Sequence, residues 1–178
     1  MENREEMIRE RIKEQDFIEA MQLEGVRQSI WEKLIGEKGF DPKDIEIDPE
    51  FNLGLSNCEA RVKIDFIVNL SSVSFMVIRC IPTAIESWER YVISFARSVK
   101  DYQIPYAVVT DGENARIFDV LAGSLIGESL KSLFSRAEAE KIMNNFKKVP
   151  CPGKRLEKEK RIVYAFEGIK CPSVKEEK

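Results

Sequence analysis

Hydrophobic and polar residues alternate most regularly in the centre of the chain. Over residues 60–70, "ARVKIDFIVNL", every second side chain is apolar. The polar side chains on the opposite face are Arg61, Lys63 and Asp65. A period of two residues is typical of a β-strand with one buried face. A short Ser-Ser turn at 71–72 leads into a second apolar run, "FMVIRCIPT" at 75–83, so the pattern predicts an antiparallel hairpin.

Other segments show the periods of helices and of shorter strands. Helices are predicted at residues 3–22, 24–38, 84–101 and near 154–167. Further strands are predicted at 45–51, as an edge strand or one interrupted by Pro49, and at 105–110 and 114–120. Ser135 and Glu138 have the spacing of a capping box, which predicts another helix start.

This order of elements predicts a mixed central sheet flanked by helices, in the α/β or α+β class. We expect an α/β domain at residues 23–134. A helical N-terminal extension at 1–22 and a helical C-terminal extension at 135–178 would flank it. A chain of 178 residues, 43% of them hydrophobic, is long enough to bury one such core.

Charge is unevenly distributed, although the net charge is only −3. Residues 1–22 contain four Lys or Arg against seven Asp or Glu, whereas residues 147–178 contain ten against five. The basic tail fits either a nucleic-acid contact or a solvated helix. No segment approaches the roughly 18 to 20 apolar residues of a membrane span, and the N-terminus is too charged for a signal peptide. We therefore expect a cytoplasmic protein with no membrane partner.

The chain contains no histidine and four cysteines, which are Cys58, Cys80, Cys151 and Cys171. The absence of histidine excludes Ser-His-Asp and Cys-His triads and mixed Cys/His zinc sites. No Cys-x-x-Cys pair supports an all-cysteine zinc site, and we expect free thiols in a reducing cytosol. A contact or bridge between Cys151 and Cys171, each followed by proline, is an alternative.

Several segments in this order resemble a known family. They are the helix "EGVRQSIWEKLI", the strand "VKIDFIV", a second strand, a helix, and then "IPYAVVTDGENARIFD". The chain resembles, over about residues 20–130, the N-terminal domain of type I restriction enzyme R subunits, of the PD-(D/E)xK nuclease superfamily. The resemblance implies a restriction-endonuclease-like fold.

The resemblance also identifies candidate site residues. Nucleases of this superfamily hold a hard cation, usually Mg²⁺, between carboxylates on neighbouring strands, which are an Asp and the Glu of a Glu-x-Lys pair whose lysine helps orient or activate water. Asp65 in "KIDF" matches the Asp, and Glu24 in "EGVRQ" matches an auxiliary acid. Aligning "VIRCIP" with Glu-x-Lys places Arg79 at the acid and Ile81 at the lysine. Across the hairpin Arg79 should reach Asp65, and a bidentate pair would occupy the oxygens that the metal needs. We thus expect a degenerate site.

Each candidate residue also has a structural interpretation. Asp65 would be an acid paired with Arg79 or Lys63, and Glu24 an acid favoured near a helix N-terminus. Arg61 and Lys63, beside Asp65, would bind phosphates or simply be solvated. The following helix has Tyr91 and Phe95 where the family often has Gln and Tyr, and their spacing with Trp88 fits a core stripe.

Catalysis would survive only by migration of the site residues. An acid such as Glu86 or Glu50, together with Lys63, would then have to reach Asp65 from elsewhere in the fold.

Three functions from different classes follow. The preferred one is a nuclease-fold module that has lost catalysis, needs no cofactor, and serves as a nucleic-acid-binding or assembly part beside a restriction-system or helicase partner. The second is an active Mg²⁺-dependent DNA endonuclease with a rearranged site. The third is a structural protein that forms a homodimer through the helix at 3–22 and the C-terminal helix.

Overall fold

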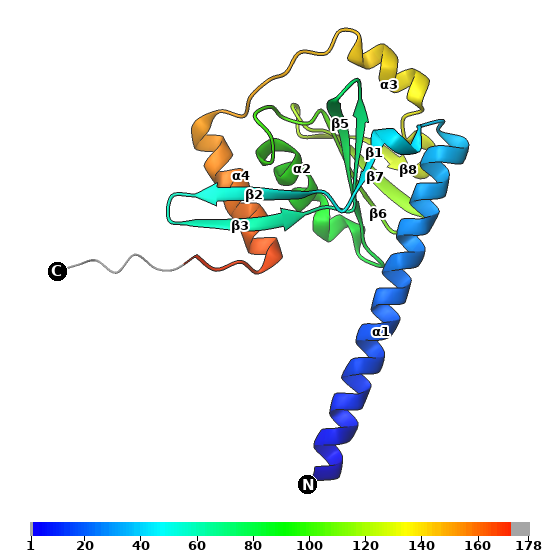
Figure 1. Ribbon diagram of the computed structural model, residues 1–178, viewed down its shortest axis with the longest axis vertical. Helices are drawn as coiled ribbons and strands as arrows, with labels where there is room; N and C mark the ends of the chain where they lie inside the picture. Colours follow the sequence, from blue (N-terminus) through cyan, green and yellow to red (C-terminus); the bar gives the residue numbers. More distant parts are fainter. Residues whose placement is uncertain (1, 172–178) are drawn as a thin grey trace, which may run out of the picture.

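A six-stranded mixed sheet forms the centre of the molecule (Figure 1). The computed structural model describes residues 2–171. Its six strands are, in spatial order, β1 (Ile45–Ile47), β4 (Phe66–Leu70), β5 (Val73–Cys80), β6 (Tyr106–Thr110), β7 (Asn114–Asp119) and β8 (Ser124–Ser129). Strands β5 and β6 are parallel and the other neighbouring pairs are antiparallel. The expected mixed sheet flanked by helices is therefore confirmed.

Helices cover both faces of this sheet. The first face packs against α1 (Glu2–Glu32), which continues as a π-helical turn (Lys33–Glu37), and against α3 (Arg136–Met143). The second face packs against α2 (Glu89–Ser98), over which lies α4 (Gly153–Glu167). Short 3₁₀ turns lie at Pro42–Asp44, Ile85–Trp88 and Leu130–Ser132. Strands β5 and β6 lie at the centre, buried on both faces, which explains their nearly continuous Val, Ile and Met content.

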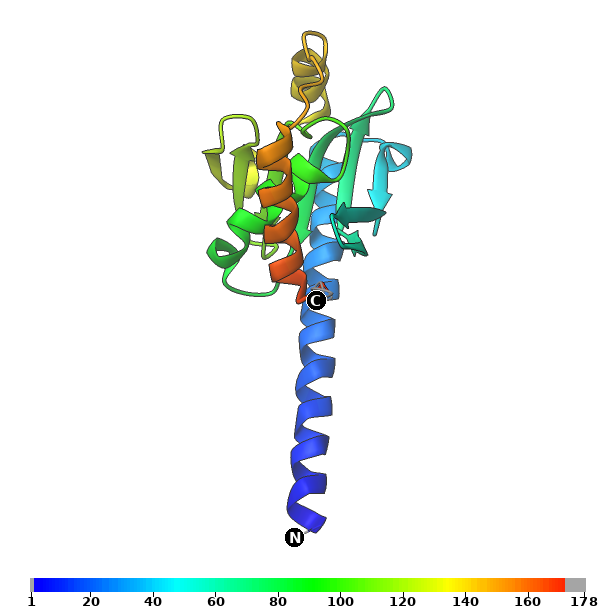
Figure 2. The same cartoon turned by 90° about the vertical axis from the view of Figure 1, so that its left-hand side faces the viewer.

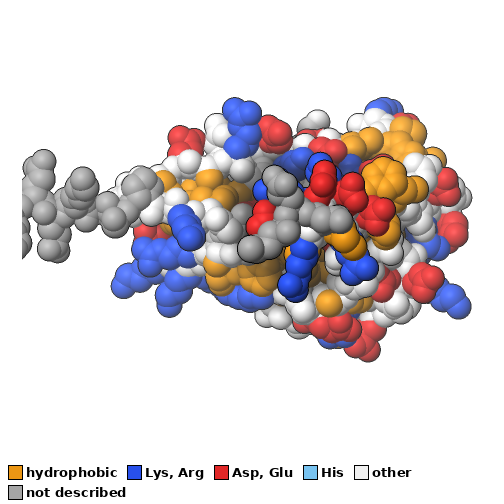
Figure 3. Space-filling model, turned by 90° about the horizontal axis from the view of Figure 1, so that it is seen from below, with side chains coloured by type: hydrophobic (Ala, Val, Ile, Leu, Met, Phe, Trp, Pro, Cys, Tyr) orange, Lys and Arg blue, Asp and Glu red, His pale blue; other side chains and the backbone are white. Residues whose placement is uncertain are grey.

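A separate hairpin of β2 (Glu50–Leu55) and β3 (Cys58–Lys63) packs against α4. Lys160 of α4 donates to the carbonyl of Gly54 at 3.0 Å, and the Tyr164 hydroxyl donates to that of Leu53. Figure 2 shows α4 running along this side of the domain. Figure 3 shows Lys and Arg side chains gathered on the left of the molecule, the side on which α4 and the hairpin lie in Figure 1.

Two of the predicted local signals are confirmed. Strands β4 and β5 form the expected antiparallel hairpin, and both residues of its Ser71-Ser72 turn have positive φ angles, of 49° and 66°. Positive φ at both central residues is typical of the tight turns that suit the twist of a hairpin. Ser135 and Glu138 form both hydrogen bonds of the capping box at the start of α3.

The structure corrects two of the expected elements and adds one strand. The predicted helices at 3–22 and 24–38 are one helix, because Gly25 is accommodated within α1. The predicted strand at 60–70 is two strands separated at residues 64–65, and its apolar side chains change sides there. Val62 and Ile64 pack on the α2 face, whereas Phe66 and Val68 pack on the α1 face. Strand β8 was not expected, because this edge strand is mostly exposed and lacks an apolar pattern.

The cysteine pairing also differs from expectation. Cys58 in β3 forms a disulfide with Cys171, and Cys80 and Cys151 are free thiols. The expected free thiols are thus wrong for Cys58 and Cys171, and the alternative Cys151–Cys171 bridge is wrong too. The chain after α4 returns to the hairpin that α4 packs against, which brings the two Cα atoms to 5.6 Å. Cysteine spacing along a sequence does not reveal such a pairing.

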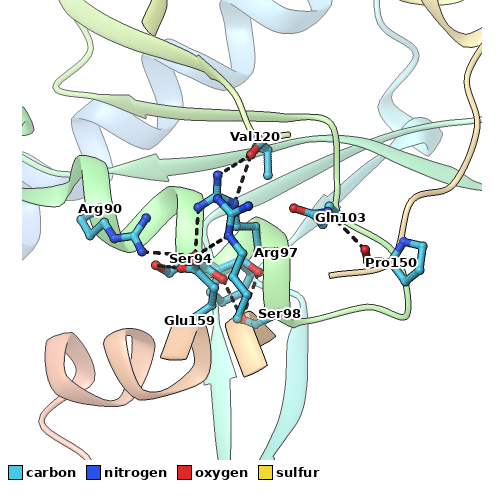
Figure 4. Close-up of polar contacts among 10 residues, drawn as sticks. Arg90, Ser94, Arg97, Ser98, Gln103, Val120, Pro150 and Glu159 are labelled. Carbon is cyan, nitrogen blue, oxygen red and sulfur yellow. Dashed lines mark hydrogen bonds and ion pairs between the residues drawn. The ribbon is translucent and has the colours of Figure 1, made fainter. Parts of the chain in front are cut away.

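A buried ion pair joins α2 to α4 (Figure 4). Arg97 Nη1 donates to Glu159 Oε1 at 2.9 Å, and both side chains are at most 2% exposed. Arg97 also donates twice to the carbonyl of Val120, at 3.0 and 2.7 Å. The Ser94 hydroxyl and Arg90 supply further hydrogen bonds to Glu159. Each charged nitrogen of Arg97 and each carboxylate oxygen of Glu159 therefore has a hydrogen-bond partner, as a buried charge requires.

No helix within residues 2–171 combines the length and the apolar character that crossing a bilayer requires.

Candidate functional site

Asp65 lies where the chain passes from β3 to β4, and its side chain is only 6% exposed. Oδ2 accepts a hydrogen bond from the backbone N–H of Cys80 at 2.8 Å, and Oδ1 accepts one from Arg27 at 2.5 Å. The carbonyl of Asp65 accepts from the N–H of Asp48 at 3.0 Å. At the break between the strands, Arg27 and the Cys80 N–H thus hold the buried carboxylate of Asp65, and the Asp48 N–H holds its backbone carbonyl.

Arg27 of α1 bridges two carboxylates. Val26 and Ile30 face the core, so that Arg27 emerges at the edge of the buried stripe of α1. Its two Nη atoms each lie 2.9 Å from an oxygen of Asp48, and Nη1 is also bonded to Asp65. Burial by itself would lower the pKa of Arg27, but the hydrogen bonds to Asp48 and Asp65 outweigh it and raise the pKa. Arg27 is therefore a permanent cation between the two acids.

Arg79 lies at the end of β5, opposite Asp65. Because Phe66 pairs with Ile78, the next position outward places Arg79 across from Asp65. Arg79 Nη1 lies 3.9 Å from Asp65 Oδ2, so the predicted salt-bridge range is confirmed. The guanidinium also stacks over the rings of Trp88 and Tyr91, at 5.0 and 5.2 Å. These aromatic residues pack in the core region as expected.

The expected bidentate pair between Arg79 and Asp65 is wrong. Arg27 and the Cys80 N–H, which the sequence reasoning missed, take the short contacts to Asp65. The bidentate contact in this cluster joins Arg27 to Asp48 instead. Within residues 2–171 the buried Arg79 Nε has no hydrogen-bond partner, which agrees with the guanidinium being held chiefly by the aromatic rings.

Cys80 and Ile81, the two residues that follow Arg79, carry no charge. Ile81 follows β5, is 5% exposed and packs in the core on the α2 face. The Cys80 thiol is buried, and this burial, with the nearby Asp65 charge, raises its pKa far above the usual value. A thiol held in its neutral form is a poor nucleophile.

A cavity of about 360 Å³ opens beside this cluster. Its charged lining residues are Arg27, Asp48, Lys63, Asp65 and Arg79. Lys63, at the end of β3, is therefore the one member of the predicted phosphate-contacting pair that the structure brings to Asp65. These lining residues comprise three cations and two carboxylates, so their net charge is positive. The cavity therefore suits an anion better than a metal cation.

The other sequence candidates lie away from this cavity. Glu24 is 76% exposed and contacts Arg27 Nε at 3.6 Å. Its expected place near a helix N-terminus is wrong, because α1 begins at Glu2. Arg61 is 73% exposed and pairs with Glu50 at 3.5 Å on the β2–β3 hairpin. Glu86 lines a separate pocket with Asp111 and Glu128.

The residues present do not fit a Mg²⁺ ion. This metal takes oxygen ligands in near-octahedral geometry, commonly including one or two carboxylates. Both carboxylates here are already neutralised by Arg27, and Arg79 adds a further positive charge at the same point. Nowhere in the described part of the chain do three or more Asp, Glu or Cys side chains converge as a metal site would require.

Sequence reasoning also missed Asp48, and the sequence carried a signal for both Asp48 and Arg27. Arg27 is a cation directly beside the apolar stripe of its helix, and Asp48 precedes the proline that interrupts the strand. Neither signal names a partner, because Arg27 and Asp65 are 38 residues apart.

Comparison with known proteins gave one result. The family described as "Type I restriction enzyme R protein N terminus (HSDR_N)" matches residues 22–133, which span the whole β-sheet and the Asp65 cluster. No curated protein and no solved structure matched. The matched region is more than half of the 178 residues. The chain belongs to the family of type I restriction enzyme R protein N-terminal domains.

Proposed function

We propose that this chain is a catalytically degenerate member of its family, which binds nucleic acid without cutting it. The carrying observation is the contact between Arg27 and both carboxylates, Asp48 and Asp65. A metal-dependent nuclease of the PD-(D/E)xK kind would need those oxygens for its cation. Ile81, buried where that pattern has its lysine, supports the same proposal.

Helix α4 offers the surface best suited to a nucleic-acid backbone. Lys154, Lys158 and Arg161 follow one another at intervals of four and three residues on its exposed side. The 15 residues of α4 extend over roughly 22 Å, a length along which duplex DNA carries about 13 phosphate charges. The hairpin beside α4 carries Lys63 into the cavity at Asp65. Phosphates bound along α4 would lie on the same side of the domain as the hairpin (Figure 1).

One observation favours the alternative of an active endonuclease with a rearranged site. Lys63 lines the cavity of Asp65 and would supply the lysine lost at Ile81. The second acid remains the obstacle, since Glu50 is paired with Arg61 and Glu86 lines another pocket. The family further supports a restriction-system subunit as the protein partner of the module.

Incubation with plasmid and single-stranded DNA tests the loss of catalysis. With Mg²⁺ or Mn²⁺ present, we expect no more cleavage than in the metal-free reaction, because Arg27 holds both carboxylates. The readout is nicked or linear plasmid on a gel. Metal-dependent cleavage that disappears in Asp65→Ala would establish the active endonuclease and overturn this proposal.

Electrophoretic shifts at several salt concentrations test the binding. Replacing Lys154, Lys158 and Arg161 by alanine should weaken binding at least about tenfold and reduce the slope of log affinity against log salt by about 3, since each phosphate contact contributes about 0.9. The matched control removes three exposed lysines near α3, Lys43, Lys131 and Lys141, and should bind like the parent chain. Equal losses of DNA affinity in both variants would mean that α4 is not the nucleic-acid-binding surface.

A further inference from the structure

The first part of α1 projects away from the domain (Figures 1 and 2). Residues 4–22 are all exposed, and burial begins only with Leu23 and Val26. An isolated helix in water has only its own backbone hydrogen bonds and side-chain pairs, whereas helical stability in proteins comes mostly from tertiary packing. The projecting segment therefore lacks the packing that would account for its helical conformation within a single copy of the chain.

This segment nevertheless carries large apolar side chains. Met7, Ile18 and Met21 are 54%, 54% and 61% exposed, and their spacing places them along one side of the helix. Phe17, at 65% exposed, lies beside this stripe, and Ile8 and Ile12 form a second one. Ile18 and Met21 lie on neighbouring turns, as do Ile8 and Ile12, whereas Met7 lies about three turns from Ile18 on the same side of the helix. Exposed apolar side chains grouped in this way are of the kind that marks a protein interface.

Charge divides the same segment into two halves. The basic half, residues 4–13, has four cations against three acids, and its cations are Arg4, Arg9, Arg11 and Lys13. The acidic half, residues 14–22, has no cation, and its three acids are Glu14, Asp16 and Glu19. A helix of this kind is complementary to itself when two copies run in opposite directions. Two copies side by side in the same direction would place three acids against three.

We propose that two copies of this chain associate through the projecting segment of α1, packed as an antiparallel pair. The apolar stripe would be buried between the helices, and each basic half would lie along the acidic half of the other copy. An antiparallel pair has the two-fold symmetry usual for homodimers, in which the same surface is used by both subunits. The two domains would then lie at opposite ends of the pair. This inference rests on α1 alone and is independent of nucleic-acid binding.

Light scattering after size exclusion tests the association and its direction. We expect a dimer at low salt and a dissociation constant about tenfold weaker at 0.5 M NaCl, because salt screens the opposite charges. A parallel pair would instead become tighter with salt, since screening relieves the repulsion between the acidic halves. A tighter dimer at high salt, or a monomer at every concentration, would overturn the proposal.

Substitution of the apolar stripe tests the surface. Replacing Met7, Ile18 and Met21 by glutamine should leave only monomer, whereas the control, with glutamine at Ile47, Leu125 and Ile126, should remain dimeric. The control residues are 54%, 36% and 49% exposed and lie in β1 and β8. An unchanged thermal unfolding midpoint would show that the domain of each variant is folded. A dimer that survives in the α1 variant, or is lost in both variants, would place the interface elsewhere.

A charge reversal separates electrostatic pairing from apolar packing. Changing Glu14, Asp16 and Glu19 to lysine makes both halves basic and should also yield monomer. Mixing this chain with one that carries Arg4→Glu, Arg9→Glu and Arg11→Glu should restore a heterodimer. If the mixture stays monomeric, the charge complementarity proposed here does not operate.

Discussion

Replacing Glu159 with alanine is expected to lower the free energy of unfolding by about 3 to 5 kcal/mol, as removal of one partner from a buried ion pair typically does. The variant leaves the Arg97 guanidinium, 2% exposed, without its counter-ion in the interface between α2 and α4. It also leaves the Ser94 hydroxyl without its acceptor. The measurement is urea denaturation followed by circular dichroism.

The same helix provides the control. Glu157 is 49% exposed, contacts Arg161 at 3.7 Å and accepts a hydrogen bond from Ser56 at 3.1 Å, so Glu157→Ala should change stability by no more than about 1 kcal/mol. The double variant Arg97→Met with Glu159→Leu should recover much of the loss, because an apolar pair often replaces a buried ion pair with little cost. Recovery should be incomplete, since the Val120 carbonyl loses two donors. A loss below about 1 kcal/mol in Glu159→Ala would show that the pair contributes little.

The decrease in the free energy of unfolding at acidic pH should also depend on Glu159. Burial favours a raised pKa, but the hydrogen bond from Ser94 and the charges of Arg90 and Arg97 outweigh it and hold the pKa below the ordinary 4.5. A folded pKa below the unfolded one means that the ionised group stabilises the fold above the unfolded pKa. This contribution is lost as the pH falls through the folded pKa. The stability gap between the parent chain and Glu159→Gln should therefore narrow as the pH falls from 5 toward the folded pKa.

Sequence reasoning succeeded where the signal is local or set by register. The capping box of Ser135 and Glu138 depends only on residues three apart. Pairing two strands across a two-residue turn predicts that Arg79 comes near Asp65, and the β-bulge at Val68–Asn69 then shifts the register by one residue so that the two lie directly opposite. Both signals use neighbours along the chain or across one hairpin.

The failures have a shared physical cause, which is contact between distant segments. The alternation over residues 60–70 continues unbroken through Asp65, yet the chain changes sheet there. Periodicity records which positions are apolar and not which face of which sheet they cover. Arg27, from a helix, and Cys171, from beyond α4, reach their partners only through the tertiary fold. Glu159 gave a usable hint, because it lies one turn before the buried Val163 on the apolar face of α4.

Replacing Arg27 with alanine is expected to turn Asp48 and Asp65 into a weak divalent-cation site. Both carboxylates bond the same guanidinium nitrogen, so removing it leaves two acidic side chains facing a common space. In metal-free buffer the free energy of unfolding of the variant should be about 2 to 4 kcal/mol lower than that of the parent chain, because the buried Asp65 loses its closest cation. Addition of Mg²⁺ or Mn²⁺ should return part of this, about 1.4 kcal/mol when the metal is at ten times its dissociation constant.

The parent chain is the decisive comparison in the same thermal unfolding series. Its midpoint should not change when Mg²⁺ replaces an equal ionic strength of NaCl, since Arg27 already neutralises both acids. The double variant Arg27→Ala with Asp48→Asn should lose the response to metal, because one carboxylate with nearby Arg79 is a poor ligand set. Stabilisation of the parent chain by Mg²⁺ that Asp65→Asn removes would show that Arg27 does not block the site. The proposed loss of catalysis would then lose its carrying observation, since a cation would have access to Asp65 in the presence of Arg27.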